Sequence, residues 1–466
     1  MSPTFEVAPS NFHNLRPQIA LVNGETPLVI WGSTIGGRKG WVARWNGSGF
    51  DAPKRANPNG SINAYSVEGP NIAAKGDTAY LVYATAPASA AKAILRTSLD
   101  GGLTWGTPRW IDSLNSDLPS FPNVSIDNAG NPLIIYMRQK SNFDTPKYMV
   151  RTSTDAGQTW ATEADASLPA PGGEVCDCCT GKVYASPGRI VALFRNNDNN
   201  LRDIWATWST DGGQNFGAGI DLDSTDWVLA ACPSSGPAAH IQNDSIFSFF
   251  MSAASGKQRI YMGAAHLDSL DSGFNRMLNP GIAVNTGQNY PAVAGKGDTI
   301  GVVWAHYDSS SSSIYMKYSF TGVAGLFNQP AFSIVDSVMG AHDYPDIAFE
   351  NGVFHIVWSN QSLSSVMYRR LAIDSFVVGL PVSAPENTLQ IAPNPVKETA
   401  HISWKIAGNE SGNLRIMNVA GKLLMEKKVT GNGELAWQTE KLAKGMYFVT
   451  LKLEFGKAKT LRFVVD

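Results

Sequence analysis

The four cysteines of the chain have the spacing most suggestive of chemistry. Three stand in the segment 174–179 (Glu-Val-Cys-Asp-Cys-Cys), and the fourth, Cys232, precedes a proline. An even number of cysteines in an oxidising compartment argues for disulfide bonds, and we expect Cys232 to pair with Cys178 or Cys179. One alternative is a thiolate site that includes Cys176 and binds a soft ion such as Cu(I) or Zn²⁺, with His240 as a further ligand. Inert free thiols are the other alternative, and the sequence does not fix the connectivity.

Charged and aromatic residues flank the cysteine segments. Glu174 precedes the first segment, Arg195, Arg202 and Asp203 lie between the two segments, and Trp227 stands shortly before Cys232. An aromatic ring beside charged groups suits sugar binding, because the ring stacks on C–H faces while polar groups bind hydroxyls. We therefore expect the functional pocket to form where these segments meet.

Three copies of one turn motif predict the fold. The motif is Ser-x-Asp-x-Gly-x-Thr-Trp or a close variant, and successive copies are about 55 residues apart. Its aspartates and aromatic residues are Asp100 and Trp105, Asp155 and Trp160, and Asp211 and Phe216. The motif resembles the Asp box (BNR repeat) of sialidase-like β-propellers, and the spacing is that of one four-stranded blade. We interpret these residues as structural, since Asp accepts hydrogen bonds from turn N–H groups and Gly adopts the left-handed conformation.

A second repeat indicates the number of blades. Short apolar segments that follow a proline recur along residues 1–380, each followed by a turn and a β-rich run. Cys178-Cys179 occupies the fourth place in this series, and the seven starts predict a seven-bladed propeller, with six blades as the alternative. The last unit is short, and we expect the strand Phe5-Glu-Val7 to complete it and close the ring.

The last part of the chain has a different character. Residues 381–386 read as a linker, and residues 387–466 as a small β-sandwich. This part resembles the C-terminal sorting domain of type IX secretion clients, on three motifs whose key residues are Pro393, Asn394 and Pro395, then Gly421, then Gly445 and Tyr447. The resemblance implies export across the outer membrane by the type IX machinery, with secretion or surface attachment. The alternative is a plain fibronectin-like spacer.

The resemblance to sialidases also names candidate active-site residues. Such sites use three arginines around a carboxylate, because guanidinium groups bind carboxylates bidentately, together with a tyrosine nucleophile. Arg138 and Arg195 take equivalent places at the ends of second strands, Arg16 or Arg202 is the third arginine, and Tyr344 is the tyrosine. Glu174 and Asp203 are the candidate carboxylates. Two features depart from the family: Leu15-Arg16-Pro17 places the arginine on the wrong side of its strand, and Tyr290-Pro291 has the same form as Tyr344-Pro345. The structural alternatives are salt bridges between blades for the arginines and repeat architecture for the tyrosine.

These observations favour a secreted or surface-attached protein that acts on glycans, with an exo-acting glycoside hydrolase as its enzymatic form. One alternative is a non-catalytic propeller that binds glycan or protein, and another is a metal or redox role for Cys176, Cys178, Cys179 and Cys232. The formal net charge of −2 gives no electrostatic case for nucleic acid, and no apolar run is long enough for a membrane span. We expect a monomer without a cofactor, a metal ion at the cysteines excepted. The first residues do not read as a signal peptide, so we expect that an export signal was removed.

Overall fold

The structure is a computed structural model. It describes residues 1–8, 13–112, 117–142, 144–242, 244–267, 274–280, 285–336, 340–373, 388–406, 411–419, 421–453 and 458–466. The chain divides into two compact units, the first comprising Met1–Phe320 and Pro330–Asp374, the second Thr321–Gln329 and Ser375–Asp466. The linker predicted at residues 381–386 lies outside the described residues. No helix among the described residues is long and apolar enough to cross a membrane.

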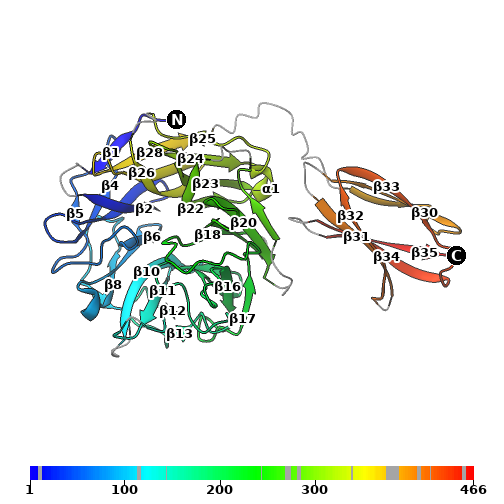
Figure 1. Ribbon diagram of the computed structural model, residues 1–466, viewed down its shortest axis with the longest axis horizontal. Coiled ribbons are helices and arrows are strands. Elements are labelled where there is room, and N and C mark those ends of the chain that lie inside the picture. The colour runs from blue at the N-terminus through cyan, green and yellow to red at the C-terminus, as the bar shows by residue number, and fades with distance from the viewer. Residues whose placement is uncertain are drawn as a thin grey trace. The chain divides into compact units, whose positions relative to one another are not determined.

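The first unit is a β-propeller of seven four-stranded antiparallel sheets, counted over the described residues. Figure 1 shows these blades arranged around a ring. The strands of the first four blades are β2 (Asn14–Val22), β3 (Thr26–Ser33), β4 (Lys39–Arg44) and β5 (Lys54–Arg55); β6 (Asn71–Lys75), β7 (Thr78–Ala84), β8 (Ala93–Ser98) and β9 (Arg109–Trp110); β10 (Leu118–Ile126), β11 (Pro132–Gln139), β12 (Lys147–Thr152) and β13 (Ala164–Asp165); and β14 (Lys182–Ser186), β15 (Arg189–Arg195), β16 (Ile204–Ser209) and β17 (Ala218–Asp221).

The remaining three blades complete the ring. Their strands are β18 (Ala238–Gln242), β19 (Ser245–Ser252), β20 (Arg259–His266) and β21 (Phe274–Met277); β22 (Gly287–Lys296), β23 (Thr299–Tyr307), β24 (Ser312–Ser319) and β25 (Phe332–Ser333); and β26 (His342–Glu350), β27 (Val353–Asn360) and β28 (Ser365–Ala372) with β1 (Phe5–Ala8). Two short helical segments, η2 (Ala88–Ala90) and α1 (Gly322–Leu326), lie in connections of the second and sixth blades. The seven predicted blades are therefore present. The fourth inner strand begins at Lys182, after the cysteine pair that was expected to start it.

The N-terminal strand closes the ring, as the sequence predicts. β1 pairs antiparallel with β28, with Phe5 opposite Tyr368 and Glu6 opposite Met367. The Phe5 ring meets Trp45 of the first blade edge-on, with ring centroids 5.0 Å apart. The two ends of the propeller thus share one sheet, which leaves no open blade edge at the junction.

The strands are buried on both faces because each blade packs between two others. In β11, Ile134 and Tyr136 pack against the second blade, while Ile135 and Met137 pack against the fourth. This period of two places alternate side chains in different cores. A continuous apolar run is therefore typical of a second strand such as β11.

The three Asp boxes form hydrogen-bonded turns between third and fourth strands. In the first, Asp100 accepts hydrogen bonds from the Thr104 hydroxyl at 2.5 Å, the Thr104 amide at 2.9 Å and the Ser98 hydroxyl at 2.8 Å, which lower its pKa to about 2. Gly102 has φ +84°, and a Cβ there would lie 2.7 Å from Leu28 in the preceding blade. Each box thus anchors one blade on another. Because strand directions alternate, these turns lie on the face opposite the starts of the inner strands.

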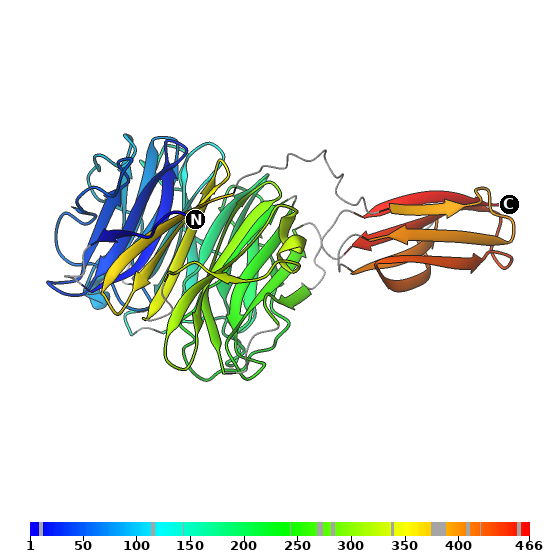
Figure 2. The ribbon, with the colours of Figure 1, turned by 90° about the horizontal axis from the view of Figure 1, so that it is seen from above.

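The second unit contains a β-sandwich, seen edge-on in Figure 2. One sheet is β29 (Thr388–Ala392), β30 (Thr399–Lys405) and β33 (Asn432–Gln438), and the other is β32 (Leu423–Thr430), β31 (Ser411–Asn418), β34 (Gly445–Leu453) and β35 (Lys459–Val465). The residues of the predicted motifs stabilise this fold locally. The Asn394 side chain bonds to the backbone of Arg462 and Val464, Gly421 has φ +76° in a turn, and the Tyr447 hydroxyl donates to the Ala443 carbonyl at 2.7 Å.

Candidate functional site

A cavity of about 580 Å³ lies along the axis of the propeller. All seven inner strands contribute to its lining, from β2 in the first blade to β26 in the last. Five residues near the starts of these strands line it, just before the strand or at its third or fourth residue: Arg16, Glu68, Phe121, Tyr290 and Tyr344. We call these five residues the channel mouth.

β-Bulges direct four of the five channel-mouth side chains, all except Glu68. The strand register shifts at Leu15/Gln18, Ser120/Asn123, Asn289/Ala292 and Asp343/Asp346. At each shift, the residue before proline has a left-handed backbone, with φ +50° for Arg16, +53° for Phe121, +52° for Tyr290 and +51° for Tyr344. This conformation is costly for residues other than glycine, and such residues cluster at functional sites.

The bulge corrects the expectation for Arg16. The sequence places this arginine on the wrong side of its strand, but the extra residue in the bulge lets it line the cavity. Its guanidinium carbon lies 5.0 Å from the Tyr344 ring centroid and 5.8 Å from that of Tyr290, and the two rings are 4.6 Å apart. Among the described residues, its hydrogen-bond partner is the Ser66 carbonyl at 2.8 Å. Arg16 therefore keeps N–H donors for a ligand.

Two carboxyl groups near Arg16 titrate close to neutral pH. Burial raises the pKa of Glu68 to about 7, although the Phe121 amide donates to its Oε1 at 2.7 Å and Arg16 is nearby. Burial also raises the pKa of Asp343 to about 6, while the Tyr307 hydroxyl donates to its Oδ1 at 2.6 Å. Two weakly acidic carboxyls beside one guanidinium leave this end of the cavity positively charged at mildly acidic pH.

Two further charged residues, Lys182 and Asp346, lie elsewhere in the cavity lining. Burial lowers the pKa of Lys182 and raises the pKa of Asp346, and the charge of each residue partly offsets the shift of the other. Asp346 also accepts a hydrogen bond from the Ile19 amide at 2.8 Å, which links the last blade to the first. We therefore assign Asp346 to the architecture.

The three predicted catalytic residues do not converge. Tyr344 lies at the channel mouth, but burial, followed by Tyr290 and Asp343, raises the pKa of its hydroxyl, which opposes a role as nucleophile. Glu174 and Asp203 are absent from the cavity lining. Asp203 is 2% exposed, and burial together with Asp221, Asp223 and Asp226 raises its pKa to about 8.

The predicted anion-binding arginines are committed to protein partners. Arg195 is fully buried and donates to the carbonyls of Ser235 at 3.2 Å, Arg202 at 2.6 Å and Met251 at 2.6 Å. Arg138 forms ion pairs with Asp117, at 3.4 Å, and with Glu163. This geometry does not fit the expected role of either arginine as an anion ligand. Arg138 forms its ion pairs inside its own blade, whereas a salt bridge between blades was the alternative.

Arg202 and Trp227 do lie together beside Arg195, as the sequence suggests. The Arg202 side chain donates to the Leu229 carbonyl at 3.0 Å, and the Arg195 guanidinium carbon lies 5.4 Å from the Trp227 ring centroid. Both residues are more than nine-tenths buried, and neither lines the central cavity. The structure thus brings this predicted cluster together as packing between the fourth and fifth blades.

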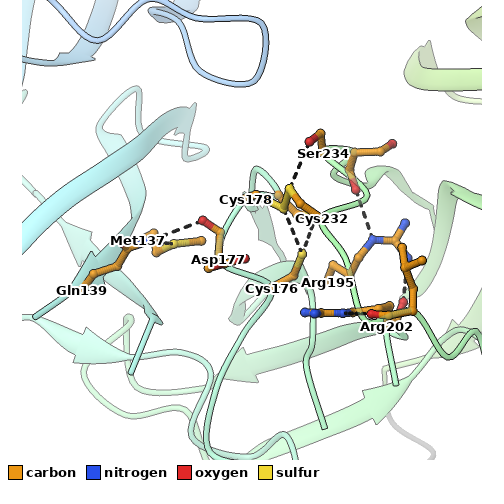
Figure 3. Close-up of a disulfide and its surroundings, with 12 residues drawn as sticks. Met137, Gln139, Cys176, Asp177, Cys178, Arg195, Arg202, Cys232 and Ser234 are labelled. Atoms are coloured by element: carbon orange, nitrogen blue, oxygen red, sulfur yellow. Dashed lines mark hydrogen bonds between the residues drawn. A yellow bond between two sulfur atoms is a disulfide. The ribbon is translucent and has the colours of Figure 1, made fainter. Parts of the chain in front are cut away.

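The cysteines meet at the same place, which we call the cysteine junction (Cys176, Cys178, Cys179 and Cys232). Cys178 forms a disulfide with Cys232, which confirms the predicted disulfide bonding and selects Cys178 as the partner. Cys176 and Cys179 are buried free thiols with Sγ atoms 2.7 Å apart, and Cys176 Sγ lies 3.7 Å from Cys178 Sγ (Figure 3). The sulfur atoms of Cys176, Cys178 and Cys179 are close enough together to be considered for a metal ion, and His240 is not part of this group.

The sequence reasoning missed Glu68, and it discounted Arg16. A usable signal was present for both, since each stands one or two residues before a proline that starts an inner strand. Tyr290 and Tyr344 stand in the same position before their prolines, but the sequence reasoning named no such residue in the second blade. That position did not by itself show that the Arg16 side chain lines the cavity, because the bulge that redirects it depends on pairing with β3.

Comparisons with known proteins agree with this architecture. A family model described as a BNR repeat-like domain matches residues 23–302, and one described as a secretion system C-terminal sorting domain matches residues 390–466. The latter indicates secretion through the type IX system, to the cell surface or the extracellular space. Among curated proteins, none matches this sequence.

Solved structures similar to the chain include proteins with different activities. A Dyadobacter fermentans protein of unknown function has 13% identity and a TM-score of 0.48, covering 68% of this chain and 96% of its own. Trypanosoma rangeli sialidase with the inhibitor DANA has 11% identity and a TM-score of 0.45, covering 99% and 87%. Penicillium chrysogenum α-L-arabinanase has 10% identity and a TM-score of 0.44, covering 79% and 98%. Similarity at this level transfers no activity to the chain.

Proposed function

The chain belongs to the BNR repeat-like family and ends in a secretion sorting domain, and from this premise we propose that its propeller binds a carboxylate-bearing glycan at the channel mouth. Arg16 carries the proposal. Its guanidinium faces a cavity, stacks beside two tyrosine rings and keeps hydrogen-bond donors for a ligand. A guanidinium fork binds a carboxylate bidentately, and aromatic rings stack on the C–H faces of a sugar.

The size of the cavity supports a small ligand. At about 580 Å³, it lies within the range of small-molecule sites, roughly 300–1,000 Å³. One or two terminal sugar units therefore fit better than a long polymer segment lying inside the propeller. Uronic and sialic acids are the carboxylated sugars of suitable size.

The state of Glu68 supports an anionic ligand. With a pKa of about 7, this carboxyl is largely protonated at mildly acidic pH and then does not neutralise Arg16. A ligand carboxylate can then take the position of the counterion. The same protonation lets Glu68 donate a hydrogen bond to a sugar oxygen.

Calorimetric titration of the full chain with matched sugars tests the proposal. We expect glucuronate or sialate to bind, and glucose or the reduced, neutral analogue to bind at least about tenfold more weakly, since an ion pair is lost. Arg16→Gln should weaken binding of the acidic sugar, whereas Arg109→Gln, at an exposed arginine of an outer strand, should not. Equal affinity for acidic and neutral sugars in wild type would refute the proposal.

Hydrolysis of the bound glycan is the second candidate function, and the raised pKa of Glu68 favours it. A carboxyl with a pKa near the working pH can protonate the leaving oxygen of a glycosidic bond. We expect Glu68→Gln to abolish release of fluorophore from an acidic glycoside while binding remains. Turnover that survives Glu68→Gln but not Tyr344→Phe would instead restore the tyrosine mechanism. Binding without turnover would leave a glycan-binding propeller.

A further inference from the structure

The cysteine junction combines a surface disulfide with a buried pair of thiols. Cys232 is exposed, and its sulfur lies 3.0 Å from the Ser234 hydroxyl. Beneath the disulfide, Cys176 and Cys179 are fully buried and form a Cys-x-x-Cys pair. Cys176 Sγ is in van der Waals contact with Cys178 Sγ, at 3.7 Å (Figure 3). All four sulfur atoms therefore lie in a continuous chain, from Cys179 in the interior through Cys176 to the Cys178–Cys232 disulfide.

The distances favour sulfur–sulfur chemistry over a metal ion. Two thiolates on one tetrahedral Zn²⁺, with bonds of about 2.3 Å, hold their sulfur atoms about 3.8 Å apart. The sulfur atoms of Cys176 and Cys179 are closer than this, at 2.7 Å, and the sulfur of Cys178 is bonded to Cys232 in a disulfide. Cys176 and Cys179 are thus close enough to form a disulfide with each other, and Cys178, as part of a disulfide, has no thiolate to offer a metal ion.

The surroundings also distinguish the two buried thiols. A hydrogen bond from Cys179 and the positive charges of Arg195 and Arg202 lower the pKa of Cys176, whereas burial and Cys176 raise the pKa of Cys179. Cys176 is therefore the more acidic thiol of the pair, and Cys179 is its hydrogen-bond donor. The thiolate is the attacking form in thiol–disulfide exchange.

We propose that the cysteine junction is a redox-active site in which Cys176 exchanges with the surface disulfide and releases Cys232 as a reactive thiol. In the first step the Cys176 thiolate attacks Cys178 Sγ, a Cys176–Cys178 bond forms, and Cys232 leaves as a thiolate beside the Ser234 hydroxyl. In the second step Cys179, after losing its proton, attacks Cys176 Sγ and releases Cys178. The products are a Cys176–Cys179 disulfide and thiols at Cys178 and Cys232, so the number of disulfides is unchanged and no oxidant is needed.

This inference does not depend on the proposed glycan function. It assigns the junction an external substrate class, namely thiols and disulfides that can reach Cys232. The buried pair supplies the two electrons, and the exposed cysteine is the contact point. A purely structural disulfide would leave Cys232 unreactive for as long as the chain stays folded.

Thiol trapping of the full chain tests the proposal. The protein is brought to one disulfide and two thiols per chain in a glutathione redox buffer, desalted without oxygen, and treated with N-ethylmaleimide while folded. Peptide mass spectrometry then measures the rate at which each cysteine is labelled. We expect Cys232 to be labelled in wild type, and at least about tenfold more slowly in Cys176→Ser, where the attacking thiolate is missing.

Cys179→Ser is the matched control, because it keeps the first step and removes the second. We expect Cys232 to be labelled in this variant, with a Cys176–Cys178 bond in the mapped peptides. Equal labelling of Cys232 in wild type and Cys176→Ser would overturn the proposal. So would wild-type protein that keeps its Cys178–Cys232 bond and is labelled only after unfolding, or a tightly held metal ion that blocks labelling. A lack of Cys232 labelling in folded wild-type protein would by itself contradict the proposal, so the test remains valid if either variant folds poorly.

Discussion

The channel mouth and the junction between the fourth and fifth blades, which holds Arg195, contain the same residue types in different roles. We call the second region the blade junction. Both place an arginine beside an aromatic ring and near carboxyl groups. The buried guanidinium of Arg195 donates hydrogen bonds to three backbone carbonyls. Arg16, in contrast, donates to one carbonyl among the described residues and faces a cavity. The difference teaches that the hydrogen-bonding capacity left over after folding separates a binding group from a structural one. Residue type and place in the repeat do not separate them.

Removing the two arginines should have very different effects on stability. Arg195→Met leaves three buried carbonyls without donors, each costing about 1–3 kcal/mol, so we expect the free energy of unfolding to fall by about 3–5 kcal/mol. Arg16→Met should cost less than about 1 kcal/mol, since the one hydrogen bond that is lost is solvent-exposed. Urea unfolding followed by tryptophan fluorescence measures both. Similar losses for the two variants would erase the contrast between the regions.

The carboxyl group of Asp203 makes the blade junction sensitive to alkaline pH. An aspartate in the unfolded chain titrates near pH 4, and the pKa of Asp203 in the folded chain is about 8, so the folded state binds its proton more tightly. The resulting stability is complete below about pH 4 and is lost as pH rises through 8. We expect the free energy of unfolding to fall by about 4 kcal/mol between pH 5 and pH 9, since about 1.4 kcal/mol is lost per pH unit between the two pKa values. Asp203→Asn should flatten this dependence, and an unchanged slope in that variant would assign it to other groups.

Glu68 should give the channel mouth a pH dependence of its own, measured in ligand binding. Its protonated form leaves Arg16 unpaired, and its ionised form competes with a ligand carboxylate. We therefore expect the affinity for an acidic sugar to fall about tenfold from pH 5.5 to pH 8.5, as the pH passes the Glu68 pKa of about 7. Calorimetric titration across this range measures it, with Glu68→Gln as the pH-independent comparison. An affinity that does not change with pH in wild type would remove Glu68 from the site.

The smallest effect is expected from the hydroxyl of Tyr344. If its ring serves as a stacking surface, Tyr344→Phe keeps that surface and should change acidic-sugar affinity by no more than about twofold. Tyr344→Ala removes the ring and should weaken binding by about tenfold, because one stacked aromatic contributes roughly 1 kcal/mol or more. Titration of both variants separates the ring from the hydroxyl. A large loss in Tyr344→Phe would mean that the hydroxyl contacts the ligand directly.

The sequence by itself determined the architecture. Three Asp boxes about 55 residues apart, proline-led strand starts and an N-terminal strand for the last blade were enough to predict seven blades and their closure. These features are local, because turn residues and the period of two act within a few positions of the chain. The sorting domain was likewise evident from three short motifs in order, and the sequence restricted the disulfide partner of Cys232 to two cysteines.

Only the tertiary structure decided which of the charged residues remain available. A one-residue bulge with a left-handed backbone turns Arg16 into the cavity, and it arises from pairing with a neighbouring strand. The three carbonyls that satisfy Arg195 come from residues 202, 235 and 251, and one of these lies in the next blade's second strand. The choice of Cys178 over Cys179 likewise depends on how two loops meet. Such contacts join residues far apart in sequence, so no local pattern encodes them.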